Sequence, residues 1–161
     1  MSIEQIDRVD RKILAELQRD GRLSNQELAD RVSLSPSPCL RRVRRLEEQG
    51  YIKGYVALVD PERVGLGLLA YITIRLNKHI DGSHAPMGDF AQAVQTWPEV
   101  VECYAMTGDM DYLLRIQVAD LAHFSRFAMD TLMRHPAVVD MRSFFALQQI
   151  KQTTELPVGS A

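Results

Sequence analysis

Apolar residues recur every three or four positions in three stretches near the start of the chain, and this pattern predicts three short helices. The first extends from Asp7 to Arg19 and is ended by Gly21. The second begins at Ser24, with Glu27 three residues later, an arrangement in which each side chain can accept from the other residue's backbone N–H. The apolar faces expected to be buried consist of Val9, Ile13, Leu14 and Leu17 in the first helix and Leu28, Ala29 and Val32 in the second.

The third predicted helix has clear start and stop signals. Ser35 can serve as its N-cap, and Pro36 then occupies the first helical position, where a missing N–H does no harm. Gly50 marks its end. Its expected buried stripe is formed by Leu40, Val43 and Leu46.

Only Ser33 and Leu34 separate the second helix from the cap of the third. So short a link favours a steep crossing of the two helices, which is the geometry of a DNA-binding helix-turn-helix. A three-helix module that mediates protein contacts has the same geometry, so the link alone leaves both interpretations open.

The periodicity changes after Gly50. Residues 51–61 are β-branched and aromatic, which predicts a connecting strand, and glycines continue a linker to Gly67. We therefore expect a helix-turn-helix domain over residues 1–50, a hinge strand and linker over 51–67, and a second domain over 68–161.

Four strands and two helices are predicted in the second domain, in the order β-α-β-β-α-β of a ferredoxin-like fold, so the whole chain is expected to be α+β. The predicted elements are strand Leu68–Leu76, helix Pro86–Trp97, strands Val101–Thr107 and Tyr112–Val118, helix Leu121–Met133 and strand Val138–Leu147. Both helices would cover one face of the sheet. The other face would carry apolar side chains that a second copy could bury, which predicts at least a homodimer: Leu69, Tyr71, Leu113, Phe145 and Leu147.

Composition and charge are those of a globular protein with a net charge of −2, of which 46% is hydrophobic. The charge is uneven: residues 1–60 hold 11 Lys and Arg against 10 Asp and Glu, and residues 61–161 hold 8 against 11, which together make 19 and 21. No apolar run reaches the roughly 18 residues of a membrane span, and the start of the chain lacks a signal-peptide pattern. A cytoplasmic protein with two reduced cysteines, Cys39 and Cys103, is expected.

Four arginines and no acidic residue occur between Leu34 and Leu46. Helical spacing directs several polar side chains away from the apolar stripe, and arginines suit phosphates and base edges. A solvated surface is the alternative interpretation of such a face. The outward residues are Ser37, Arg41, Arg44 and Arg45.

The stretch from Leu34 to Gly50, with its Ser-Pro-Ser-Pro-Cys start and Arg-Arg-Val-Arg-Arg-Leu-Glu core, closely resembles the recognition helix of the Lrp/AsnC (feast/famine) transcriptional regulators. Further segments resemble the leucine-responsive branch of the family, so the similarity covers nearly the whole chain; they are residues 7–14, 50–55, 107–114 and 150–157. The resemblance implies a winged helix-turn-helix joined to an amino-acid-sensing (RAM) domain. It also implies a cytoplasmic, nucleoid-associated regulator of amino-acid metabolism that binds double-stranded DNA, with dimers that assemble further, commonly into octamers.

The resemblance also assigns DNA contacts to five positions of the third helix and its start: Ser35, Ser37, Arg41, Arg42 and Arg45. The serines suit phosphates, and Arg41 and Arg45 are the candidates for base edges. Arg44 is expected to contact the DNA backbone or to remain solvated.

An amino-acid effector is implied between neighbouring dimers, beside the turn at Gly108 and Asp109, with Asp111 tied to the effector response. Such a ligand needs N–H groups for its carboxylate, an acceptor for its ammonium group and an apolar wall. The apolar surroundings favour leucine or methionine, whereas a plain hairpin turn is the alternative interpretation of the Gly108 segment. Looser matches to the effector site are Ala105, Leu121, Phe144 and Phe145.

Other chemistry has little support in the sequence. Asp109 and Asp111 lack a third metal ligand at a suitable spacing, the four histidines have no zinc spacing, and Cys39 is interpreted as a packed thiol and not as a reactive sensor. No nucleophile and base pair is evident, so neither an enzyme nor a cofactor is expected. Two alternatives remain: a nucleoid-architectural protein of low sequence specificity, and a small ferredoxin-like enzyme of amino-acid metabolism.

Overall fold

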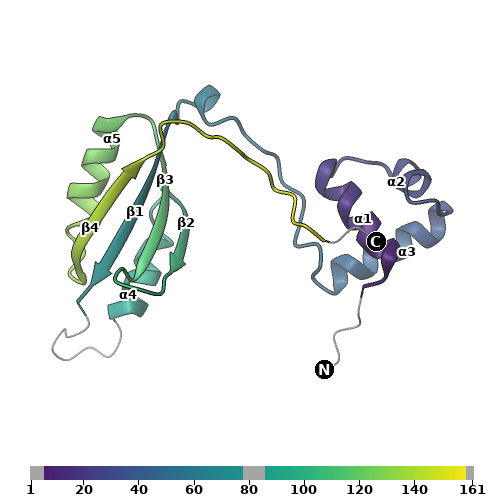
Figure 1. Cartoon of the computed structure of the whole chain (residues 1–161), viewed down its shortest axis with the longest axis horizontal. Helices are drawn as coiled ribbons and strands as arrows, with labels where there is room; N and C mark the ends of the chain where they lie inside the picture. The colour runs from purple at the N-terminus through teal and green to yellow at the C-terminus, as the bar shows by residue number, and fades with distance from the viewer. Residues whose placement is uncertain (1–5, 78–85, 159–161) are drawn as a thin grey trace. The chain divides into compact units, whose positions relative to one another are not determined.

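The computed structural model describes residues 6–77 and 86–158. Contacts divide the chain into two compact units, drawn in Figure 1. The first unit combines the residues up to Ala57 with a segment that starts at Lys151, and the second unit is Leu58–Ile150. The sequence had placed residues 68–161 in one domain, so the return of the C-terminal segment to the first unit is a difference from that expectation.

Three helices make up the first unit: α1 Arg8–Arg19, α2 Asn25–Arg31 and α3 Pro36–Glu48. The expected capping box of α2 is present, with Ser24 and Glu27 each accepting from the other's backbone N–H. α1 begins with a second capping box, formed by Asp7 and Asp10. Beyond α3, Gly50 has a φ of +75°, the left-handed conformation that favours glycine at a helix end.

The helices of the first unit enclose one core. On α3, Cys39 and Leu46 have no exposed surface, and Val43 packs against the same core. The expectation that Leu40 is buried was wrong, because it is 38% exposed. Cys39 takes the buried position, and Leu40 lies about 100° further round the helix. The buried members of this core are Ile13, Leu14, Leu28, Ala29, Val32, Cys39 and Leu46.

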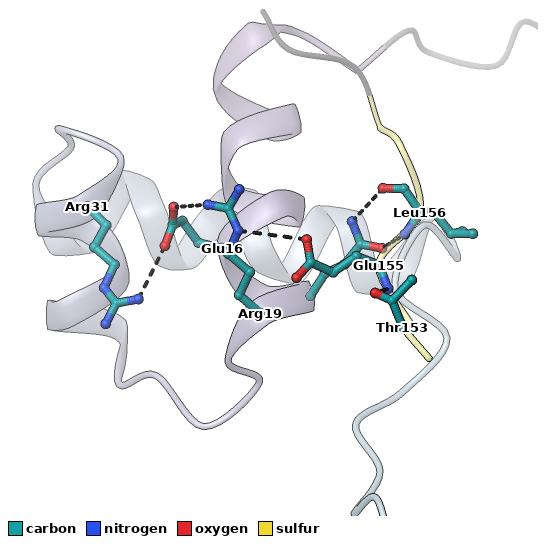
Figure 2. Close-up of polar contacts among 7 residues, drawn as sticks. Glu16, Arg19, Arg31, Thr153, Glu155 and Leu156 are labelled. Carbon is teal, nitrogen blue, oxygen red and sulfur yellow. Dashed lines mark hydrogen bonds and ion pairs between the residues drawn. The ribbon is translucent and has the colours of Figure 1, made fainter. Parts of the chain in front are cut away.

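The described part of the C-terminal segment, residues 151–158, lies against α1 (Figure 2). The Gln18 side chain pairs with the backbone of Leu156, since its Nε2 donates to the Leu156 carbonyl at 3.1 Å and its Oε1 accepts from the Leu156 N–H at 2.6 Å. Arg11 Nη1 donates to the Val158 carbonyl at 2.6 Å, and Val158 packs against the core of the first unit. The segment is therefore an integral part of this unit.

A chain of ion pairs connects α2, α1 and the C-terminal segment, as Figure 2 shows. One oxygen of Glu16 lies 3.2 Å from Arg31 Nη1, and its other oxygen lies 3.2 Å from Arg19 Nη1. Arg19 Nε in turn lies 3.8 Å from Glu155 Oε2. Arg19, Arg31 and Glu155 are about half exposed, so each pair contributes little stability on its own.

The connecting strand expected over residues 51–61 is not formed, although all of these residues are described. The expectation was wrong because a strand needs a neighbour for its backbone hydrogen bonds, and none pairs with this stretch in the single chain. Tyr51 and Ile52 pack against the core of the first unit, but the apolar side chains further along are largely exposed, with Val56 at 85% and Leu58 at 73%. A short 3₁₀ helix, η1 Glu62–Val64, follows and ends at Gly65 with a φ of +78°.

The second unit follows the predicted β-α-β-β-α-β order. Its four strands form one antiparallel sheet in the order β2-β3-β1-β4, which confirms the ferredoxin-like topology and the α+β class. The elements are β1 Leu68–Leu76, α4 Pro86–Val94, β2 Val100–Ala105, β3 Tyr112–Val118, α5 Leu121–Arg126, η2 Phe127–Leu132 and β4 Val138–Phe145.

Both helical segments cover the same face of the sheet (Figure 1). Phe90 of α4 and Phe124 of α5 pack with the buried alternate residues of β1 and β3. The expected single helix from Leu121 to Met133 is α-helical only as far as Arg126 and continues as a π-helix. Leu121 was placed on the apolar face by periodicity, but it is 60% exposed.

The uncovered face of the sheet differs from the expectation at one aromatic residue. Phe145 pairs with the buried Ala70 and packs its ring 4.9 Å from that of Phe124, so it lies on the helix-covered side. Phe144 pairs with Tyr71 and lies on the uncovered face instead. The placement of Phe145 on that face was wrong because the register of β4 against β1, which its own periodicity does not determine, sets the side. The other expected residues do lie on the uncovered face or beyond its end: Leu69, Tyr71, Leu113 and Leu147.

Candidate DNA-binding helix and effector site

The first turn of α3 exposes two hydroxyl groups. Ser35 is the N-cap, but its side chain makes no capping hydrogen bond, and Ser37 is also exposed. Pro36 occupies the first helical position. The positive end of a helix dipole attracts anions, so two unengaged hydroxyls at this place suit a phosphate group.

Hydrogen bonds tie the turn between α2 and α3 to both helices. The Leu34 N–H donates to the Ala29 carbonyl at 2.9 Å, and Ser33 adopts a left-handed φ of +58°. Asn25 Nδ2 donates to the Pro36 carbonyl at 2.9 Å, which ties the start of α2 to the start of α3. This tight, cross-linked turn confirms the predicted helix-turn-helix geometry.

The four arginines of α3 fall into two classes. Arg41 and Arg44 are exposed and form no ion pair with any described residue. Arg42 Nη1 donates to Asp10 Oδ1 at 2.8 Å, and Arg45 Nη2 donates to Asp10 Oδ2 at 2.5 Å. Asp10 has no exposed surface, so two of the predicted DNA contacts are already engaged by a buried carboxylate.

Asp7 joins Asp10, Arg42 and Arg45 to form a cluster of four charged side chains. Its Oδ2 accepts from Arg42 Nη1 at 2.7 Å. The pKa of the Asp7 carboxyl is lowered, first by the hydrogen bond from the Asp10 N–H and also by Arg42. The pKa of the Arg42 guanidinium is raised, first by its hydrogen bond to Asp10 and then by that to Asp7.

This cluster was not predicted from the sequence, because periodicity describes each helix by itself and the arginines of α3 were assigned to DNA. The contacts with Asp10 join residues 32 and 35 positions apart in the chain. The presence of an acidic residue inside an otherwise apolar helix face was the available signal.

Arg41, Arg42 and Arg45 line a shallow pocket on this surface. A hollow lined by guanidinium groups has the chemistry to accept a phosphate oxygen. Because Arg42 and Arg45 share the charge of Asp10, Arg41 is the member of this pocket without an intramolecular counterion among the described residues.

Both cysteines are free thiols. Cys39 is fully buried in the first unit, and Cys103 is half-buried in the second. Burial raises the pKa of each thiol, which lowers the fraction of reactive thiolate. The interpretation of Cys39 as a packed residue agrees with this burial.

The turn proposed to hold the effector connects β2 to β3. Gly108 has a φ of +109°, and the Met106 N–H donates to the Asp111 carbonyl at 2.8 Å, which closes the hairpin. Gly108 and Asp109 are exposed at its tip, and Ala105 is exposed at the end of β2. Within residues 6–77 and 86–158, no three side chains gather as metal ligands would.

Asp111 has a structural role in addition to any role in binding. Its Oδ2 accepts from the Leu76 N–H at 2.8 Å, and its own N–H donates to the Ile74 carbonyl at 2.7 Å. The residue therefore joins the start of β3 to the end of β1. Its carboxylate is already engaged, whereas Asp109 at the turn is exposed.

The predicted effector residues do not come together within one chain. The Gly108 turn and Ala105 lie at the end of the sheet where β3 begins, whereas Leu121 follows the end of β3 (Figure 1). Phe145 pairs with Ala70, which in turn pairs with Ile116 near that second end. The seven residues of β3 separate the two groups, a distance of about 20 Å at the usual rise per residue.

Each of the two units matches a known protein family. Residues 6–53 match the family described as winged helix-turn-helix DNA-binding. Residues 69–156 match the family described as Lrp/AsnC ligand binding domain, more than half of the chain.

The chain belongs to the Lrp/AsnC family. Among its relatives in this family is the leucine-responsive regulatory protein of Escherichia coli (strain K12), which is 44% identical over 155 residues, or 96% of this chain and 93% of the relative. The Lrp/AsnC membership expected from the sequence is therefore confirmed.

Solved structures of Lrp/AsnC and related regulators agree with the fold. A transcriptional regulator from Neisseria meningitidis, in complex with L-Met, is 49% identical and superposes with a TM-score of 0.90, covering 96% of this chain and 97% of its own. An AsnC family transcriptional regulator from Agrobacterium tumefaciens is 43% identical with a TM-score of 0.88, covering 95% and 97%.

Proposed function

We propose that this chain is a sequence-specific transcriptional regulator of amino-acid metabolism, controlled by an amino acid that its second unit binds. The observation that carries the proposal is α3: an exposed basic helix, started by two unengaged serines and held by a cross-linked turn, within a winged helix-turn-helix DNA-binding domain. The Lrp/AsnC ligand binding domain in the same chain supports the second half of the proposal.

In this proposal α3 enters the major groove of double-stranded DNA. Ser35 and Ser37 contact phosphates, Arg41 contacts base edges and Arg44 contacts the backbone. The exposure of all four side chains supports these roles. Two further predicted contacts, Arg42 and Arg45, have to compete with the ion pairs that already hold them.

The effector site is proposed to lie between two copies of the chain. One copy would contribute the turn at one end of its sheet and the other the apolar residues from the opposite end, because a single chain holds the two groups about 20 Å apart. Leucine or methionine fits the apolar part, and the L-Met in the Neisseria relative supports this class of ligand. The two contributions are Ala105, Gly108, Asp109 and Asp111 from one copy and Leu121, Phe144 and Phe145 from the other.

A homodimer is proposed to form through the uncovered face of the sheet, with further assembly to a higher oligomer such as an octamer. Phe144 is 54% exposed and Tyr104 is 53% exposed on that face, so association would remove apolar surface from water. A cytoplasmic, nucleoid-associated location follows from binding DNA. Across the described parts of the chain, no helix is both long and apolar enough to cross a membrane.

Selection of DNA from a random duplex library tests the proposal. Wild-type protein should enrich a defined motif, and Arg41→Ala should weaken binding to that motif far more than binding to unselected DNA. Enrichment of no motif would favour the nucleoid-architectural alternative. Calorimetry and sedimentation with each common amino acid test the ligand, and neither heat nor a change of assembly with any of them would remove that part.

A further inference from the structure

We propose that Asp10 is a positioning residue that sets the sequence specificity of DNA binding. By holding Arg42 and Arg45, it keeps two of the four α3 arginines away from phosphates, so that α3 contacts DNA mainly through Arg41 and Arg44. This inference rests on the proposed DNA binding by α3.

Hydrogen bonds to both oxygens fix the carboxylate of Asp10. Each oxygen accepts from one arginine, at 2.8 Å from Arg42 and 2.5 Å from Arg45. The capping box fixes its position further, because Asp10 Oδ2 accepts from the Asp7 N–H at 3.0 Å and Asp7 Oδ1 accepts from the Asp10 N–H at 2.8 Å. Because the carboxylate is already fixed, binding the two arginines does not add the cost of ordering the acceptor.

Because Asp10 is buried, the two ion pairs are costly to break when DNA binds. Asp10 has no exposed surface, so release of both arginines to a phosphate would leave a buried negative charge without a positive partner. Arg41 and Arg44 have no such counterion among the described residues, and their exposed side chains can reach DNA without breaking a contact. The four arginines are therefore unequal, although the sequence presents them as one basic run.

The pairing has a consequence for specificity. Phosphate contacts strengthen binding to every DNA sequence, whereas base contacts distinguish one sequence from another. The two arginines and the acids Asp7 and Asp10 have no net formal charge together, so this cluster adds little to the attraction for the backbone. In this inference the base-edge role that the resemblance gives Arg45 is replaced by its ion pair with Asp10, and Arg41 is left to contact base edges. Released Arg42 and Arg45 would add phosphate contacts, so holding them lowers non-specific affinity more than specific affinity and raises the ratio of specific to non-specific affinity.

The salt dependence of binding measures this effect. Each phosphate neutralised by a side chain adds about 0.9 to the slope of log affinity against log salt concentration, so release of both arginines adds up to about 1.8 for each α3 helix. Over a fourfold increase in salt, that difference corresponds to roughly a tenfold additional loss of affinity.

The test uses the full-length protein and a random-sequence duplex as the probe. Asp10→Asn should steepen the salt slope and strengthen binding to the random duplex, and it should lower the ratio of affinities for a selected motif and the random duplex. Glu48→Gln is the matched control, because it also removes one negative charge from the first unit, at an exposed residue that forms no ion pair with Arg42 or Arg45. The salt slope of this control should stay close to that of the wild type. A merely structural role of Asp10 would instead weaken binding to both duplexes.

Chemical modification of the wild-type protein with an arginine-specific reagent gives a second measurement that does not depend on a variant's folding. Without DNA, Arg41 and Arg44 should react several-fold faster than Arg42 and Arg45. With the random duplex present, only Arg41 and Arg44 should gain substantial protection. Equal reactivity of the four arginines would overturn the inference.

These outcomes separate the inference from the proposed function. Failure of the wild-type protein to bind either duplex would remove the DNA-binding proposal and with it the consequence for specificity. A folded Asp10→Asn variant that binds both duplexes with an unchanged or shallower salt slope would overturn the role of Asp10 and leave DNA binding intact.

Discussion

Replacement of Asp111 with alanine should destabilise the second unit, whereas the same change at Asp109, two residues earlier, should not. Asp111 Oδ2 accepts from the Leu76 N–H at 2.8 Å, and Leu76 is only 4% exposed. Loss of the acceptor leaves a buried N–H without a partner, which costs about 1–3 kcal/mol of unfolding free energy. Asp109 is exposed at the turn, so its replacement should change stability by no more than about 0.5 kcal/mol.

Urea unfolding followed by tryptophan fluorescence measures this difference. The chain has one tryptophan, and Trp97 lies against the core of the second unit, so its signal reports on the unit that contains Asp111. With a slope of about 1–3 kcal/mol per molar urea, the Asp111→Ala midpoint should fall by roughly 1 M.

Amino-acid binding by the same two variants separates structure from recognition. Asp109→Ala should weaken the binding of leucine or methionine in calorimetry while it keeps the wild-type urea midpoint. An Asp111→Ala midpoint equal to that of the wild type, or an equal fall for Asp109→Ala, would refute the assignment of Asp111 as the link between β1 and β3.

Three further changes test the first unit. Gln18→Ala removes both hydrogen bonds to Leu156, so the free energy that holds the C-terminal segment against α1 should fall by about 1–2 kcal/mol. Limited proteolysis should then cut this segment faster than in the wild type. Leu46→Ala empties a fully buried position and should cost about 2–5 kcal/mol in denaturant unfolding; a smaller loss would show that the core collapses around the gap. Burial, and then the hydrogen bond to Glu47, raises the pKa of Tyr55 from 10.0 to about 12. Between these two pH values the folded state keeps the Tyr55 proton while the unfolded chain loses it. The contribution of Tyr55 to the free energy of unfolding is therefore full below pH 10.0 and is lost as the pH rises to about 12. In Tyr55→Phe the urea midpoint should therefore fall less steeply over this pH range than in the wild type. An equally steep fall in the variant would show that other groups cause it.

The elements of the fold were predicted closely where local signals decide them. β1 and β3 have the expected bounds because residues alternate between a buried and a partly exposed face along each strand. The start of α2 follows from the reciprocal pair Ser24 and Glu27, which is complete within four residues.

Features that depend on distant partners were missed. The side on which Phe145 lies is set by its pairing with Ala70, 75 positions earlier, and not by the pattern of β4 itself. Residues 51–61 have the composition of a strand, but composition does not supply the neighbouring strand that would complete one. The partners of Asp10 were missed because its place on the apolar face of α1 signals a buried acid but does not identify Arg42 and Arg45 of α3 as the residues that neutralise it.

The candidate site shows the same division. The basic character of α3 was evident from sequence, but which of its arginines are available depends on a carboxylate from α1. The effector residues were predicted as one set, yet the length of β3 places them in two groups.

In terms of chain topology, the second unit is an insertion within the first. The chain leaves the first unit after Ala57 and re-enters it at Lys151. The contacts of Gln18 and Arg11 are therefore completed only by Leu156 and Val158, which lie 138 and 147 positions later in the chain. During synthesis α1, α2 and α3 can fold as soon as they emerge, but the surface of α1 stays uncovered until the second unit has been made. A fragment that ends at Ala57 would therefore expose a face of α1 that the whole chain covers. DNA binding measured on such a fragment would be that of a first unit without its C-terminal segment.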